Sequence, residues 1–176
     1  DLEALPPHIK GEIIEACSTH SHARAPHGLS ATGITSSLGG PYGFDPNGPG
    51  GWWILSEPGI ELPGSPEVSP DIAGWRRERL PRLPAKEPIR VVPDWVCEVL
   101  SPSNRKYDLR IKFPYYAKIG VAYLWVVDTE AHAVQTKKLI DGRFSDVAVF
   151  ADDETLCAEP FEAVKIPLAP LWLPDT

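Results

Sequence analysis

The sequence predicts an α/β protein in which a mixed β-sheet packs against helices. Residues 94–100 (DWVCEVL) read as a strand, and 122–128 (AYLWVVD) form the near-continuous apolar run of a buried strand. Between them, the pattern predicts a helix from Asp108, as N-terminal cap, to about Ile119, with Gly120 as its C-terminal stop. Strands separated by one central helix favour this fold class.

Further strands are expected on both sides of this central part. Asp141–Gly142 is a turn signal, so the strand at 133–139 should pair with the strand that follows it. Earlier in the chain, apolar runs predict short strands at 12–16, at 52–55 with an end near Glu57, and at 68–73.

The length of 176 residues fits one domain, 1–176, with a core of its own. Residues 39–51 hold six glycines and three prolines, which predicts a Gly/Pro-rich loop. A loop of this length is often a functional flap. Residues 160–176 form a Pro-rich tail that we expect to pack as loop.

Charge is unevenly distributed along the chain. The net charge is −7, but residues 76–118 contain 11 of the 17 Lys and Arg residues and only five acids, which makes this segment +6. A basic segment in an acidic protein indicates either a surface for a polyanion such as nucleic acid or a solvated basic loop and helix face. Both interpretations stay open at this stage.

The three cysteines are too few and too scattered for a disulfide framework or a zinc cluster. We therefore expect reduced thiols and a cytoplasmic protein. No apolar run approaches the length of a membrane span, so no membrane partner is expected.

Glu98 is the first candidate for chemistry, because it lies within an apolar strand. Side chains alternate across a strand, so Val96, Glu98 and Leu100 share one face. A buried carboxylate is costly unless a metal ion or a cationic partner compensates its charge.

Asp71 and Lys112 are the candidates to complete a site with Glu98. Two carboxylates from neighbouring strands, aimed at one point, form a hard oxygen site suited to Mg²⁺. Such an ion activates water, and a nearby lysine stabilises charge on a phosphate. The alternative is structural: a solvated aspartate, a glutamate paired with an arginine, and a surface lysine.

Three segments carry a resemblance to a known family: SPDI (69–72), PDWVCEVLSPSNRKYDLRIK (93–112) and YYAKIGVAYLWVVD (115–128). Together they resemble the Uma-type putative restriction endonuclease family, within the PD-(D/E)XK nuclease superfamily. The resemblance runs from about residue 11 to residue 144 and is densest over 93–128.

This resemblance implies a restriction-endonuclease-like core, a central mixed sheet flanked by helices. It implies a metal-dependent endonuclease that hydrolyses DNA phosphodiester bonds with Mg²⁺, with Mn²⁺ as a possible substitute, and a homodimer that cuts two strands. Asp71 and Glu98 match the family's metal-binding acids, and Lys112 matches its active-site lysine.

Two positions depart from the simplest superfamily pattern. That pattern places the lysine two residues after the acid, where this chain has Leu100, so the lysine must come from the following helix. Pro114 lies where the family continues that helix, and we expect a kink or a late helix start there. Whether Lys112 reaches Glu98 depends on this proline.

Additional site residues are expected among the remaining acids. An N-terminal element often adds an acid to the nuclease fold, and Glu12 or Glu15 could supply it, although both also fit a surface position. Glu57 ends a strand next to Asp71 and could line the site.

Histidines and an aromatic residue complete the candidates. Of His20, His22 and His27, the last is favoured, because the family often has a histidine before its first helix. Tyr116 lies one helical turn after Lys112 and on the same face, where it could position a phosphate or a water or simply close the core.

Two other functions stay open at the level of sequence. One is a catalytically inactive binding or regulatory module that keeps the nuclease fold. The other is an interaction protein that forms an oligomer through an edge strand and the Pro-rich tail.

Overall fold

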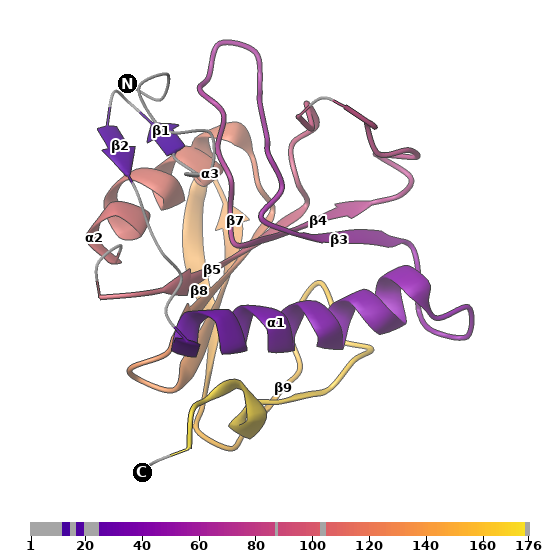
Figure 1. Ribbon diagram of the computed structural model, residues 1–176, viewed down its shortest axis with the longest axis vertical. Coiled ribbons are helices and arrows are strands. Elements are labelled where there is room, and N and C mark those ends of the chain that lie inside the picture. The colour runs from indigo at the N-terminus through magenta and orange to yellow at the C-terminus, as the bar shows by residue number, and fades with distance from the viewer. Residues whose placement is uncertain (1–11, 15–16, 20–24, 87, 103–104, 175–176) are drawn as a thin grey trace.

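The computed structural model describes residues 12–14, 17–19, 25–86, 88–102 and 105–174, the first two ranges as backbone only. Its centre is a six-stranded sheet in the order β3-β4-β5-β6-β7-β8 (Figure 1). β5 and β6 are parallel and all other neighbours are antiparallel. The predicted mixed sheet is therefore confirmed, with strands β3 (Trp52–Ser56), β4 (Ile72–Arg76), β5 (Trp95–Leu100), β6 (Tyr123–Asp128), β7 (Ala133–Ile140) and β8 (Arg143–Ala151).

A helical crossover joins the parallel strands β5 and β6, as parallel pairing requires. It consists of α2 (Arg105–Tyr107), the π-helical turn η3 (Asp108–Lys112) and α3 (Phe113–Ile119). Gly120 ends α3 in the left-handed conformation at φ 87°, as predicted. This crossover packs on one face of the sheet, as do residues of the β3–β4 and β4–β5 loops.

Helix α1 (Ala25–Gly39) packs on the opposite face, together with the C-terminal segment (Figure 1). Ile34 and Leu38 are fully buried there, and Ser30 Oγ donates a hydrogen bond of 2.7 Å to the carbonyl of Leu171. A Cβ at Gly33 would lie 2.3 Å from a Leu171 methyl group, so glycine allows this close approach. The sequence patterns did not predict α1.

The loop predicted over 39–51 is wrong for its first half. The π-helix η2 (Gly40–Phe44) continues α1 directly, and the Asp45 amide donates to the carbonyl of Gly40 at 2.8 Å. Pro41 is the second residue of η2 and has no N–H to donate to the preceding turn of α1. Only residues 45–51 form a loop.

The core has two layers, and β5 contributes to both. Trp95, Cys97 and Val99 face α1, whereas Val96 and Leu100 face the crossover. This alternation is the one predicted for 94–100. Six residues of β5 in succession are buried, so the strand lies at the centre of the molecule.

Smaller elements complete the fold. The predicted strand at 68–73 begins only at Ile72, because Val68 instead forms an isolated bridge with Ile60. The predicted hairpin at Asp141–Gly142 is confirmed, with positive φ at both residues. The remaining elements are β1 (Glu12–Ile14), β2 (Cys17–Thr19), β9 (Thr155–Leu156), β10 (Ile166–Pro167) and the 3₁₀ turn η4 (Ala169–Leu171), so the tail is not loop throughout.

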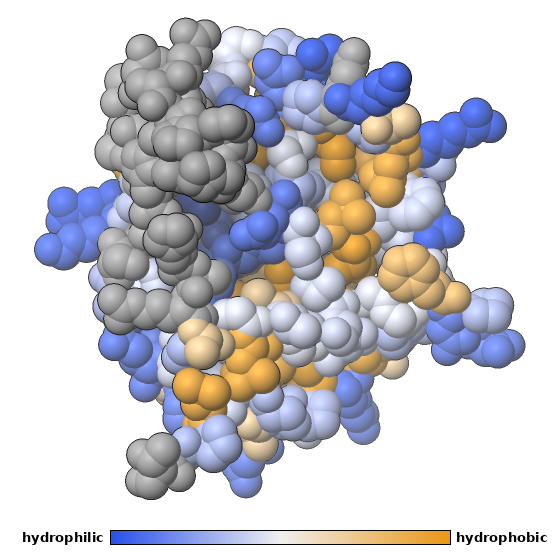
Figure 2. Space-filling model, in the orientation of Figure 1, coloured by the Kyte–Doolittle hydropathy of each residue, from blue (hydrophilic) through white to orange (hydrophobic). Residues whose placement is uncertain are grey.

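Within the described part of the chain, no helix is long and apolar enough to cross a membrane. On the face drawn in Figure 2, apolar residues form separate patches among hydrophilic ones.

Candidate active site

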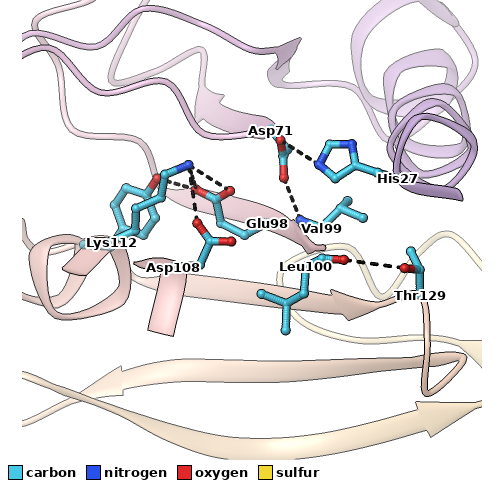
Figure 3. A network of polar contacts seen from close by, with 9 residues as sticks. His27, Asp71, Glu98, Val99, Leu100, Asp108, Lys112 and Thr129 are labelled. Atoms are coloured by element: carbon cyan, nitrogen blue, oxygen red, sulfur yellow. Dashed lines mark hydrogen bonds and ion pairs between the residues drawn. The ribbon is translucent and has the colours of Figure 1, made fainter. Parts of the chain in front are cut away.

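The site begins where β4 and β5 meet. Asp71 immediately precedes β4, and the antiparallel register pairs Ile72 with Cys97. Continued by one residue, this register would place Asp71 opposite Glu98. The Asp71 carboxylate also accepts a hydrogen bond of 2.7 Å from the backbone N–H of Val99 (Figure 3). Adjacent strands thus bring the two predicted acids together.

Glu98 is buried, with a relative exposure of 1%, and two side chains from the crossover contact its carboxylate. Tyr116 Oη donates a hydrogen bond of 2.5 Å to Oε1. Lys112 Nζ lies 3.3 Å from both Oε1 and Oε2 (Figure 3). The lysine therefore reaches Glu98 from the helix, as the sequence required.

Burial raises the pKa of Glu98 well above its ordinary value, because the charged form loses its hydration. Lys112 opposes this rise, while the neighbouring carboxylates of Asp71 and Asp108 add to it. The shift favours the neutral form of the Glu98 carboxyl group, and perturbed carboxyl groups of this kind are frequent at functional sites.

Asp71 is paired with His27 in the first turn of α1. His27 Nε2 lies 3.2 Å from Asp71 Oδ1, and both side chains are largely buried. The hydrogen bond to Asp71 raises the pKa of His27. Burial acts to raise the pKa of Asp71, but His27, Lys112 and the Val99 N–H together lower it. Both shifts favour a charged pair.

Pro114 does not remove Lys112 from the site, because a π turn precedes it. In a regular α-helix the proline ring would clash with the carbonyl four residues earlier. In η3 the N–H of Phe113 instead bonds the carbonyl of Asp108, five residues back. Pro114 then lies in the first turn of α3, where proline is tolerated.

Asp108 is the site residue that sequence reasoning missed. It was predicted to cap a helix, but the helical segment starts at Arg105 and Asp108 lies inside it, only 3% exposed. Its Oδ1 lies 3.7 Å from Lys112 Nζ. The signal that could have identified it is the i, i+4 spacing of an acid and a lysine on one helix.

The additional site residues predicted from the sequence lie in different places. Glu57 follows β3, and its backbone N–H donates to the carbonyl of Asp71 at 2.9 Å, so it lies next to the site. The backbone of Glu12 lies in β1, but its side chain is outside the described residues, as are Glu15, His20 and His22. Of the additional candidates, His27 and Tyr116 contact the proposed acids directly.

Asp71 and Glu98 are the oxygen donors at the site that could hold a hard divalent cation. Three carboxylates (Asp71, Glu98, Asp108) face two cationic side chains (Lys112, His27), which leaves an excess of negative charge when all are ionised. In the described part of the chain, no group of three or more His, Cys, Asp or Glu side chains is arranged to hold a metal. Asp71 and Glu98 alone would therefore leave most ligand positions to water, which Mg²⁺ accepts.

The chain matches a model of a known protein family. A model of the Uma2 family, described as "Putative restriction endonuclease", matches residues 6–169. The chain belongs to the Uma2 family. The matched range contains β3 to β8, the crossover and the residues of the site described above.

A solved structure supports the fold of this Uma2 protein. A crystal structure from Anabaena variabilis, titled a putative nuclease, matches with a TM-score of 0.73 at 19% sequence identity. The match covers 97% of this chain and 93% of the other. The predicted nuclease-like fold is thereby confirmed. A comparison with curated proteins gave no match.

Proposed function

We propose that this Uma2 protein is a Mg²⁺-dependent nuclease that hydrolyses phosphodiester bonds in DNA. The observation that carries the proposal is the buried Glu98 carboxylate, 3.3 Å from Lys112 and next to Asp71 at the end of two adjacent strands. The description of the Uma2 family supports the same reaction class.

Asp71 and Glu98 would hold Mg²⁺, or Mn²⁺ in its place. When bound, the ion would supply an activated water and neutralise charge on the phosphate. The protein orients both acids in advance: His27 and the Val99 N–H fix Asp71, and Tyr116 fixes Glu98. This fixed geometry avoids reorganisation during the reaction.

Lys112 would stabilise the negative charge that develops on the phosphate during cleavage. A lysine ammonium is a compact charge with three donors, suited to phosphate oxygens. Its burial strengthens this interaction, because fewer waters screen the charge. The lysine thus compensates Glu98 at rest and would serve the substrate during turnover.

Nucleic acid is the proposed partner because of the charge near Lys112. Lys106 and Arg110 are exposed on the same helical segment and would attract a phosphate backbone. We further propose a homodimer, in which two sites cut the two strands of a duplex. A monomeric mass in solution at micromolar concentration would contradict the dimer.

One observation favours a second candidate, an inactive module that binds nucleic acid without cutting it. Glu98 is only 1% exposed and already has Lys112 and Tyr116 as partners. In that case the Lys112–Glu98 ion pair would take the place of a metal ion. The two candidates differ in a single property, metal-dependent cleavage.

Incubation with supercoiled plasmid and with single-stranded DNA, in Mg²⁺, in Mn²⁺ and in EDTA, separates the candidates. The nuclease should nick only with metal. Asp71→Asn, Glu98→Gln and Lys112→Met should each lower the rate by roughly 10²–10³-fold, as the loss of one stabilising group does. The exposed Glu130→Gln and Lys118→Met serve as matched controls. Equal nicking by all proteins would indicate contamination and overturn the proposal.

A further inference from the structure

The crossover presents three buried polar side chains in one line toward Glu98. Asp108, Lys112 and Tyr116 follow each other at intervals of four, and their exposures are 3%, 7% and 0%. In a regular α-helix, positions eight residues apart differ by roughly 80° around the axis. The π turn closes with an i to i+5 bond and so rotates less per residue. This smaller rotation offsets the drift and keeps Asp108 above the same face as Tyr116.

Lys112 consequently contacts two carboxylates from different elements. Glu98 approaches from β5 at 3.3 Å, and Asp108 approaches from one turn earlier on the helix at 3.7 Å (Figure 3). Lysine carries its charge on a flexible four-carbon chain, which has many rotamers when unconstrained. Contacts with two anions limit the positions that the ammonium can take.

The two carboxylates differ in what else contacts them. Glu98 accepts a hydrogen bond from Tyr116 and lies opposite Asp71, so it belongs to the proposed metal pair. Asp108 lies on the helix, and its carboxylate contacts Lys112. Any cation that shared Glu98 would repel the Lys112 ammonium, and Asp108 is then the anion that retains it.

We infer that Asp108 is a positioning residue, which fixes the Lys112 ammonium beside Glu98 and keeps it there when Glu98 binds a cation. This inference rests on the proposed function insofar as Lys112 acts on the phosphate. Asp108 acts through Lys112 and does not itself contact the substrate.

A purely structural role for Asp108 makes different predictions. A buried ion pair is weak evidence for stability, because desolvation offsets the attraction between the charges. If Asp108 only stabilised the helix, its removal would lower the denaturation midpoint and leave the turnover of folded protein unchanged. If it positions Lys112, its effect on turnover must depend on the lysine.

The test is a double-mutant cycle of Asp108→Asn and Lys112→Met, with Asp108→Glu as conservative variant and the exposed Asp153→Asn as control. Plasmid nicking in Mg²⁺ gives kcat and KM for each folded protein. Asp108→Asn should lower kcat by roughly 10–10²-fold, as a misplaced group does, with little change in KM. Asp108→Glu should recover part of this loss. In the Lys112→Met background, Asp108→Asn should have almost no further effect.

An equal loss of kcat from Asp108→Asn in both backgrounds would overturn the inference. The same cycle is also measured on metal-free protein, through urea denaturation midpoints in EDTA. If no protein cuts DNA, the proposed function fails, and the denaturation cycle decides the inference by itself. If the changes in midpoint caused by the two substitutions do not add, Asp108 and Lys112 interact and the inference stands. If the changes add, the inference is rejected.

Discussion

Lys112 Nζ lies 3.3 Å from each carboxylate oxygen of Glu98, although one residue belongs to the crossover and the other to the central strand. Both side chains are buried, so the pair is shielded from water. The fold therefore encloses a charge pair at the site where chemistry is proposed. The stability of the folded protein should depend on both partners of this pair.

Lys112→Met should destabilise the metal-free protein by about 3–5 kcal/mol, because it leaves Glu98 as a buried carboxylate without its cation. Adding Glu98→Gln should restore part of this loss, since no unpaired charge then remains. Urea denaturation in EDTA measures both. Lys118→Met, exposed on the same helix, should change stability by no more than about 0.5 kcal/mol. A Lys112→Met protein as stable as wild type would contradict the buried pair.

The His27–Asp71 pair predicts a pH dependence of stability. The pKa of His27 is raised, so its contribution is complete below the unfolded value of about 6.5 and is lost as pH rises through the folded pKa. The pKa of Asp71 is lowered, so its contribution appears above about 3.9 and is lost as pH falls through the folded pKa. The His27–Asp71 pair should contribute most to the stability of the folded protein between these two pH values.

Comparison of wild type with His27→Ala in denaturation experiments across this range checks the prediction. The stability difference should be larger near about pH 5.5 than near about pH 9, where neutral His27 no longer forms an ion pair. His132, which lies outside the site and stacks on Trp172, provides the control variant His132→Ala. A difference that grows with increasing pH would contradict the assignment.

Phe161 organises the aromatic core beneath α1. Its ring lies within 5.6 Å, between centroids, of Tyr42, Trp52, Trp95 and Trp125. Phe161→Ala should therefore cost about 3–5 kcal/mol in unfolding free energy. Phe44 is 83% exposed, so Phe44→Ala should have almost no effect. Similar denaturation midpoints for the two variants would show that Phe161 does not hold this core together.

The central strands and the hairpin could be predicted because their signals are local. The alternation across β5 and the apolar run of β6 follow from side-chain periodicity, and Asp141–Gly142 encodes its turn directly. Asp71 and Glu98 were found as candidates because each lies in or beside such a strand.

The helical parts were harder to predict, for two physical reasons. α1 contains glycine and proline and has little amphipathic pattern, and it is held by packing against η4 rather than by intrinsic propensity. The π turn at Asp108 has no simple periodicity, so the sequence placed Asp108 at a cap and left the reach of Lys112 undecided. Only the three-dimensional packing shows that α1 forms and that Lys112 reaches Glu98.

The most direct test of a metal site at Asp71 and Glu98 is a Mn²⁺ titration of the protein, followed by electron paramagnetic resonance of the free ion. Wild type should bind Mn²⁺ at a single site per chain. Asp71→Asn and Glu98→Gln should each weaken this binding more than about tenfold, because each removes a carboxylate ligand that hard cations require. The exposed Asp153→Asn should bind as wild type does. Unchanged Mn²⁺ affinity in Glu98→Gln would contradict the proposed metal site.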